Sequence, residues 1–420
     1  MVELNIKAET ILAQRFQIGT LIGKGSFGKV YFAIDLQSNK EVAVKIETKK
    51  SKHSQLSNES TILQELQGIV GIPRYVFSSD QGEYNILVME LLGESIRSKF
   101  SKCNKIFSLK TTLLISEQML DRIKSLHDHG YIHRDIKPQQ FVTPYCDKEN
   151  LIYLIDYGLS KKYINKLGFH IPYTENCPFA GTYYYASINC HTGIQQGRRD
   201  DLESMLYSIA FLLRGDLPWI PNSKQKFSAA RIHVIKLKTS PLKLMKDAPY
   251  DFSELLCYVK SLQYDTRPDY DYIKGILSEL KRKVNVNDNI FDWNILIEVN
   301  NNRRLYKQNK KKKQSKERDE SVAISKTSIS FYEQVVLESS EDSKTIEQSK
   351  FPEFHNRNIL PQKPIQGIIE SITLPLTLQY SDKNEQSVDE SHYERRPRTH
   401  SFDINMLESR IQQKSNCIIF

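Results

Sequence analysis

The 420-residue chain is 39% apolar and 10% aromatic, so it can bury a sizeable core, and its length allows two or three compact units. Its formal net charge of +9 is compatible with nucleic acid, anionic lipid or acidic protein partners without choosing among them, and we expect most of these cations to be solvated. No apolar run approaches the roughly 20 residues of a membrane helix, Val2 excludes N-myristoylation, and six cysteines without C-x-x-C pairs or zinc spacing indicate reduced thiols in a cytosolic protein.

The first part of the chain has the pattern of a β-rich unit. Apolar residues alternate at Phe16–Ile22, and the β-rich runs Lys29–Ile34 and Glu41–Ile46 follow with a polar turn between them. Asn58–Leu66 has a helical pattern, and Ile86–Met89 reads as a buried strand. We therefore predict several strands and one helix before residue 90.

A glycine loop and a lysine strand come early in this unit. Gly23–Val30 reads G-K-G-S-F-G-K-V, whose backbone N–H groups can lie over phosphates, although a hairpin turn or a dinucleotide loop gives the same pattern. A strand follows, and Val42–Lys45 reads V-A-V-K, which favours a loop covering nucleotide phosphates held by Lys45. Glu59 on the next helix is the best candidate partner for this lysine, because Glu65 would face differently.

From about residue 93 the pattern becomes helical. Apolar residues recur at a period near 3.6 between Ile115 and Leu126, and helical periodicity returns at Asp201–Leu213 and Phe252–Leu262. A larger helical unit therefore follows the β-rich one.

Two further motifs in this second unit carry acidic residues. His133–Pro138 reads H-R-D-I-K-P, in which Asp135 would orient a substrate hydroxyl and Lys137 would neutralise a moving phosphoryl group. Asp156–Gly158 reads D-Y-G, and Asp156 would bind Mg²⁺ that bridges the phosphates. A lysine at position 137 is typical of transfer to serine or threonine rather than tyrosine.

In this order the motifs resemble the protein kinase superfamily and, within it, casein kinase 1. The narrower resemblance rests on four strings: Met89–Gly93, Ala186–Asn189 in place of A-P-E, Arg198–Ser204, and Phe291–Asn294. It implies an α+β, two-lobed protein kinase fold with a disordered C-terminal tail. The boundaries are an extension over 1–15, the N-lobe over 16–90, the C-lobe over 91–295 and the tail over 296–420.

The resemblance also implies a site for ATP with Mg²⁺ or Mn²⁺. Asp201 would brace the backbone of the loop that holds Asp135. The expected catalytic residues are Asp135, Lys137, Lys45 and Glu59, and the expected metal ligands are Asp156 and Gln140. The residues expected to contact ATP are Ile22, Gly23, Lys24, Gly25, Ser26, Phe27, Gly28, Val30, Ala43, Lys45, Met89, Glu90 and Leu92.

The sequence departs from the family pattern in two places. Gln140 replaces the asparagine that holds a second Mg²⁺, and its extra methylene displaces the amide oxygen, so we expect weaker metal binding and slower turnover. Thr174, Cys177 and Tyr184 stand where casein kinase 1 carries basic residues that hold a primed phosphate. We therefore expect a reduced preference for phosphate-primed substrates.

The composition changes near residue 300. Lys310–Lys313 and a Ser-, Glu- and Gln-rich stretch with weak periodicity indicate disorder over about 300–416. Cys417–Phe420 fits C-a-a-X, which indicates geranylgeranylation and peripheral membrane attachment, the alternative being a frayed apolar end. We expect a cytoplasmic monomer, with the nucleus left open, that acts on Ser/Thr in acidic protein contexts and binds no specific nucleic acid.

Three functions follow from these patterns. The first is an active serine/threonine kinase, because the residues for all five expected roles are present: Lys45, Glu59, Asp135, Lys137 and Asp156. The second is a weakened pseudokinase that binds nucleotide as a scaffold, motivated by Gln140. The third is a non-enzymatic nucleic-acid or lipid binder, whose support is the basic charge alone.

Overall fold

A computed structural model describes residues 6–25, 28–48, 55–80, 84–145, 150–221, 226–299, 302–305 and 307, which belong to one structural unit. The predictions for the tail beyond residue 307, with Lys310–Lys313 and Cys417, lie outside these ranges, as do those for Ser26 and Phe27. Within the ranges, no helix is both long enough and apolar enough to cross a lipid bilayer.

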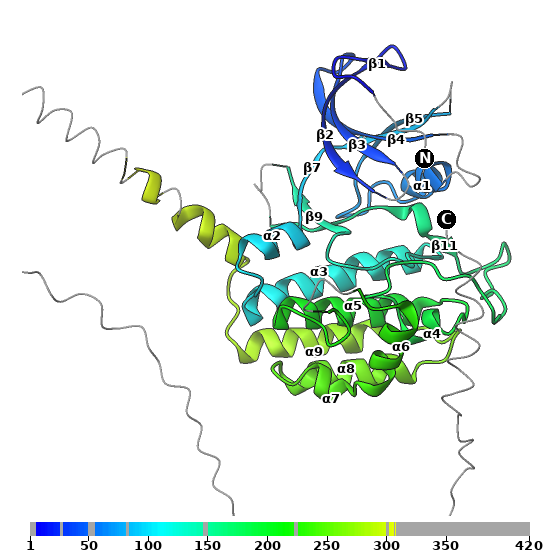
Figure 1. Cartoon of the computed structure of the whole chain (residues 1–420), viewed down its shortest axis with the longest axis vertical. Coiled ribbons are helices and arrows are strands. Elements are labelled where there is room, and N and C mark those ends of the chain that lie inside the picture. Colours follow the sequence, from blue (N-terminus) through cyan, green and yellow to red (C-terminus); the bar gives the residue numbers. More distant parts are fainter. Residues whose placement is uncertain are drawn as a thin grey trace, which may run out of the picture. The chain divides into compact units, whose positions relative to one another are not determined.

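The N-terminal lobe is built on a six-stranded antiparallel sheet with the strand order β1-β2-β3-β4-β6-β5 (Figure 1). Alternate side chains of its strands point to one side, where Phe16 and Ile18 of β2 meet Ala33 of β3 and Val42 and Val44 of β4 in a buried cluster. The strands are β1 (Ile11–Leu12), β2 (Phe16–Lys24), β3 (Lys29–Asp35), β4 (Lys40–Thr48), β5 (Tyr75–Ser79) and β6 (Tyr84–Glu90).

The strand predictions are confirmed for β2, β3, β4 and β6, each of which is one to three residues longer than the predicted run. The sequence analysis missed β5, an edge strand. All five of its residues are half-buried, so it has no alternation of buried and exposed positions for a pattern to reveal.

Helix α1 (Gln55–Glu65) begins three residues before the predicted helix at Asn58–Leu66. Its buried face carries Ile62 and Leu63, which join the large core shared with the helical lobe. Full burial of one such side chain contributes about 1.5–3 kcal/mol. Glu59 lies on the same face and is therefore carried into the interior with them.

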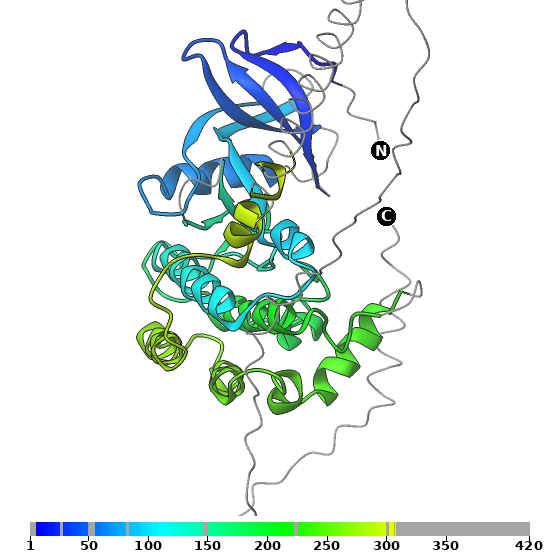
Figure 2. The same ribbon diagram turned by 90° about the vertical axis from the view of Figure 1, so that its left-hand side faces the viewer.

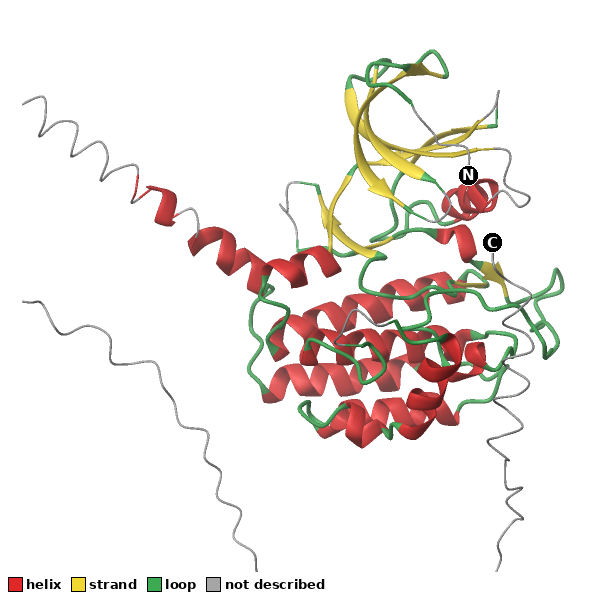
Figure 3. Ribbon diagram, viewed as in Figure 1, coloured by secondary structure: helices red, strands yellow, loops and turns green. Residues whose placement is uncertain are grey.

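The C-terminal lobe is mainly helical, and the division between strands and helices is visible from two directions (Figures 2 and 3). This arrangement confirms the two-lobed α+β fold that the sequence resemblance implies. The helices are α2 (Ile96–Lys102), α3 (Leu109–Asp128), α4 (Ile188–His191), α5 (Arg198–Arg214), α6 (Ala229–Lys238), α7 (Pro241–Leu244), α8 (Tyr250–Ser261) and α9 (Tyr270–Lys283).

Helices α3 and α5 form the centre of this lobe, and each has a defined end. The Ser108 hydroxyl caps α3 by accepting a hydrogen bond from the Thr111 N–H, and the predicted apolar face between Ile115 and Leu126 is buried. Helix α5 ends at Gly215, whose φ of 88° is left-handed and favours glycine. Both helices contribute to the same large core.

Two small sheets hold the loops between the lobes. One has the order β10-β9-β7, and the other pairs β11 with β8. The segment 133–140 connects β8 to β9, and each of these two strands is hydrogen-bonded within its own sheet. Its ends are thereby anchored. These strands are β7 (Leu92–Ser95), β8 (Tyr131–Ile132), β9 (Phe141–Pro144), β10 (Tyr153–Leu154) and β11 (Lys161–Lys162), and a 3₁₀ turn covers Tyr157–Leu159.

Candidate active site

Four of the side chains expected to contact a nucleotide lie on one face of the large sheet. Val30 of β3 pairs with Lys45 of β4, and Ala43 of β4 pairs with Met89 of β6. Side chains opposite each other across paired strands share a face, and Ala43 and Lys45, two residues apart, point the same way. The register therefore assembles these positions from three strands.

The glycine loop crosses from β2 to β3. The Gly25 N–H donates a hydrogen bond to the Gly28 carbonyl (2.9 Å), which joins the end of β2 to the start of β3. A Cβ atom at Gly28 would lie 2.4 Å from the Ile46 carbonyl oxygen, so a larger residue would force β3 and β4 apart. Ile22, before the turn, is half-exposed.

Lys45 is held by two carboxylates from distant parts of the chain. Its Nζ lies 2.5 Å from Oε2 of Glu59 on α1 and 2.7 Å from Oδ1 of Asp156. The predicted Lys45–Glu59 ion pair is therefore formed. Glu65 has other partners, because it accepts a hydrogen bond from the Tyr131 hydroxyl and lies 3.4 Å from Lys162.

This cluster shifts the pKa of each member. Burial alone would lower the pKa of Lys45, but the charges of Glu59 and Asp156 raise it, so the ammonium stays charged. Burial raises the pKa of Glu59 to about 7, against the attraction of Lys45 and with the repulsion of Asp156. The pKa of Asp156 would also rise on burial, but Lys45 brings it well below the usual range.

Asp156 has a strained backbone. Its φ and ψ of 70° and 71° are left-handed, a conformation that non-glycine residues adopt at a cost and that is common at functional sites. Tyr157, which follows, is fully buried, and its hydroxyl donates to the Leu154 carbonyl (2.7 Å). This bond satisfies the one polar atom that distinguishes D-Y-G from D-F-G.

The segment 133–140 presents Asp135 between two donors. Lys137 Nζ lies 2.6 Å from Asp135 Oδ2, and the Thr182 hydroxyl donates to Asp135 Oδ1 (2.7 Å). Lys137 also donates to the Thr182 hydroxyl oxygen (2.9 Å). The sequence analysis missed Thr182, and the only signal that marked it is its place directly after Gly181 and four residues before the Ala186–Asn189 string begins.

Asp201 at the start of α5 holds the backbone of this segment, as predicted. Its carboxylate accepts hydrogen bonds from the N–H groups of His133 (2.6 Å) and Arg134 (2.9 Å). His127 of α3 approaches the same carboxylate at 3.0 Å, and because a carboxylate only accepts, His127 Nε2 carries the hydrogen. Asp201 therefore fixes the left-handed Arg134, whose φ is 68°.

Gln140 lies between the two motif carboxylates. Its Nε2 is 3.1 Å from Asp135 Oδ2 and 3.0 Å from Asp156 Oδ2. The side chain is buried at 5% exposure, which leaves it little freedom to leave this position.

The donor set suits a divalent cation with help from a nucleotide. The described residues contain no group of three or more His, Cys, Asp or Glu side chains placed to bind a metal on their own. Mg²⁺ usually keeps several waters and takes one or two carboxylates together with phosphate oxygens, and the Asp156 carboxylate fits that role.

The strand junction β6–β7 contains the positions expected to face adenine. Met89 is half-buried and packs against the large core. The Glu90 N–H donates to the Arg74 carbonyl (2.9 Å) and is therefore already engaged. The backbone group of Glu90 that could bind adenine is its carbonyl oxygen. Leu92 begins β7 and pairs with Pro144.

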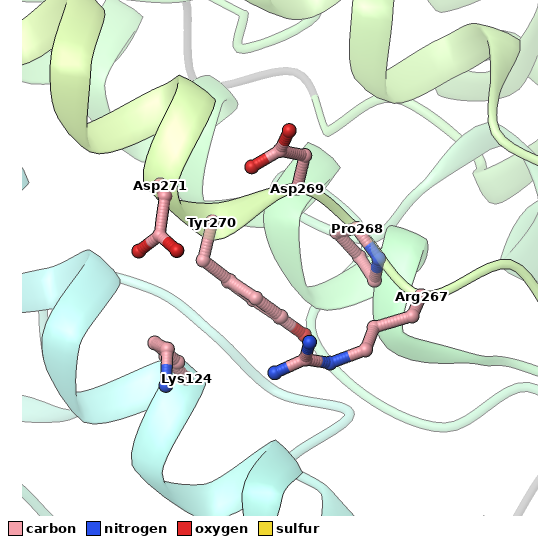
Figure 4. A pocket seen from close by; sticks show the side chains of 6 residues that line it. All are labelled: Lys124, Arg267, Pro268, Asp269, Tyr270 and Asp271. Carbon is pink, nitrogen blue, oxygen red and sulfur yellow. The ribbon is translucent and has the colours of Figure 1, made fainter.

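A shallow hollow of about 330 Å³ lies elsewhere, between α3 and the start of α9 (Figure 4). Lys124 and Arg267 line it, and each forms an ion pair with Asp128 and lies over the ring of Tyr270. Its two cations are therefore already compensated, and none of the predicted site residues lines it.

A comparison with protein families agrees with the geometry described above. The chain matches the family described as protein kinase domain over residues 16–275, more than half of its length. The match includes the glycine loop, the Lys45–Glu59 pair, and the segments that carry Asp135 and Asp156. The chain therefore belongs to the protein kinase family.

Proposed function

We propose that this protein transfers the γ-phosphate of ATP to serine or threonine hydroxyls of proteins, in the manner of casein kinase 1. The observation that carries the proposal is the placement of Asp135, whose carboxylate is oriented by Lys137 and Thr182. Phosphoryl transfer depends mainly on positioning and charge stabilisation, and this arrangement supplies both.

The proposed roles follow from the contacts. Asp135 orients the substrate hydroxyl and accepts its proton, while Lys137 stabilises charge on the transferred group. Lys45, oriented by Glu59, holds the nucleotide phosphates. Asp156 holds the divalent cation, which when bound neutralises charge on the phosphates.

The serine/threonine and casein kinase 1 assignments rest on residues beyond the shared kinase motifs. Lys137 and the strings Ala186–Asn189 and Arg198–Ser204 support them. A preference for hydroxyls in acidic sequence contexts follows from the casein kinase 1 resemblance, and the net charge of +9 is compatible with it.

The test is transfer of phosphate from ATP to casein with Mg²⁺ or Mn²⁺, with wild type beside Asp135→Asn. We expect transfer by the wild type and a loss of at least about a hundredfold in the variant, the scale of a positioned acid–base group. Equal rates in the two proteins would contradict the assignment of Asp135.

A nucleotide-binding scaffold with weak or no transfer is the second candidate. The position of Gln140, which donates to both carboxylates, is the observation that favours it. Binding of ATP with no detectable transfer, under conditions in which a control kinase phosphorylates casein, would support the scaffold over the enzyme.

A further inference from the structure

Gln140 is the one neutral member of a row of alternating charges that crosses the active site. Each neighbouring pair in the row is joined by a hydrogen bond or ion pair of 2.5–3.1 Å. The members, in order, are Glu59, Lys45, Asp156, Gln140, Asp135 and Lys137. Two positions in this row lie between two carboxylates. One holds the cation Lys45, and the other holds the neutral Gln140.

The chemistry of the partners decides which end of the Gln140 amide faces them. Ionised carboxylates only accept hydrogen bonds, and one amide terminus lies within 3.1 Å of both Asp135 Oδ2 and Asp156 Oδ2. Only the NH₂ group can donate one hydrogen to each. The amide oxygen is bonded to the same carbon and therefore cannot occupy that position at the same time.

The backbone of Gln140 is anchored on both sides of this contact. Its N–H donates to the Lys137 carbonyl (3.0 Å), and its carbonyl accepts from the Ile155 N–H (2.9 Å), next to Asp156. The side chain is 95% buried. Gln140 is therefore held at the point where the two acidic segments meet.

We propose that Gln140 takes the place of a second metal ion, so that the nucleotide complex of this enzyme carries one divalent cation, on Asp156. Gln140 is then a positioning residue whose NH₂ group keeps Asp135 and Asp156 together. Kinases generally have an asparagine at this position, which holds a second Mg²⁺. A second cation here would require the amide to turn, with loss of both hydrogen bonds. The inference rests on the proposed kinase function.

The experiment counts bound metal rather than product. The full chain is mixed with an equimolar, non-hydrolysable ATP analogue, and Mn²⁺ is titrated while electron paramagnetic resonance measures free Mn²⁺. We expect one Mn²⁺ per complex for the wild type and two for Gln140→Asn. Gln139→Asn, the same change at the exposed neighbour, is the matched control and should keep one.

A second variant keeps the inference open to refutation if Gln140→Asn folds poorly. Gln140→Glu has nearly the same shape but cannot donate when ionised, and it adds a third carboxylate. We expect it to bind a second Mn²⁺ roughly tenfold or more tightly than wild type, the scale of changes around metal sites.

The outcomes separate this inference from the function on which it rests. A wild type that phosphorylates casein and binds two Mn²⁺ with the affinities of Gln140→Asn would overturn the role of Gln140 alone. A wild type that binds no nucleotide and transfers no phosphate would remove the inference and the proposed function together.

Discussion

The prediction about phosphate-primed substrates rests on three single residues, Cys177, Thr174 and Tyr184. Cys177 lies 3.6 Å from Gln195 Oε1, which also accepts a hydrogen bond from Lys161 (3.2 Å), so the thiol and this ammonium share one partner. Thr174 is exposed, and Tyr184 is half-buried. At the three positions where the casein kinase 1 resemblance implies basic side chains, this chain has none, whereas Lys161 remains.

We expect this enzyme to phosphorylate primed and unprimed versions of an acidic peptide with similar kcat/KM. Cys177→Lys would add a cation beside Lys161, and one charge-assisted hydrogen bond corresponds to a gain of roughly tenfold or more for the primed peptide. Cys257→Lys, the same change at an exposed position on α8, is the control. Strong dependence on priming in the wild type would show that the neutral residues do not set this preference.

At the scale of elements, helix α6 holds the segment that follows Thr182. Lys236 Nζ donates to the carbonyls of Tyr183 (2.9 Å) and Ala186 (2.5 Å), and Trp219 Nε1 donates to the carbonyl between them, that of Tyr184 (2.7 Å). The Lys236 side chain is buried, and its ammonium lies over the ring of Trp219. Three backbone carbonyls between residues 183 and 186 thus depend on one lysine and one indole.

Lys236 also makes stability depend on pH. Burial lowers its pKa to about 7, against the raising effects of Glu203 and Cys190 and with a further lowering effect of Lys260. Between pH 7 and about 10 the unfolded chain would bind a proton at Lys236 that the folded protein releases. The free energy of unfolding therefore gains a contribution that increases with pH, by at most ~1.4 kcal/mol per pH unit.

Denaturant unfolding of wild type and Lys236→Met at several pH values between 7 and 10 measures this contribution. The difference in unfolding free energy, wild type minus variant, should increase with pH across that window. A difference that stays constant would mean that the carbonyls keep Lys236 charged in the folded protein throughout.

At the scale of the whole molecule, Asp201 links three parts of the helical lobe. It lies at the start of α5, accepts from His127 of α3, and holds the backbone of residues 133–134. Burial would raise the pKa of Asp201, but the hydrogen bond and the electrostatic attraction of His127 lower this pKa, so Asp201 stays ionised. The position of Asp135 is thus coupled to the packing of the central helices.

Asp201→Asn should therefore affect both stability and turnover. Removing one partner from a buried charged network costs about 3–5 kcal/mol, and the loosened loop should lower kcat tenfold or more. KM for ATP should change little, because most of the positions predicted to contact ATP lie on or beside the N-terminal sheet. Asp216→Asn, at a half-exposed aspartate, is the control. A large increase in KM with unchanged kcat would contradict this division of roles.

The local patterns of the chain were enough to predict β2, β3, β4, β6 and the faces of α1 and α3. The signals for these elements are the alternation of apolar residues, a 3.6-residue period and glycine at a turn. Each of these signals arises from residues that are neighbours along the chain. Lys45, Asp135 and Asp156 could be singled out in the same way, because each lies in a short motif of defined order, and their roles stay predictions.

Other features exist only after distant segments pack. Thr182 reaches Asp135 across 47 residues, and nothing in the pattern around it predicts that contact. The sequence marks Gln140 as a departure, but its donor role depends on both carboxylates lying within 3.1 Å. Lys236, in an ordinary amphipathic helix, reads as solvated until the carbonyls of Tyr183 and Ala186 surround it. Local periodicity specifies which side of an element is buried, whereas long-range packing specifies which groups meet there.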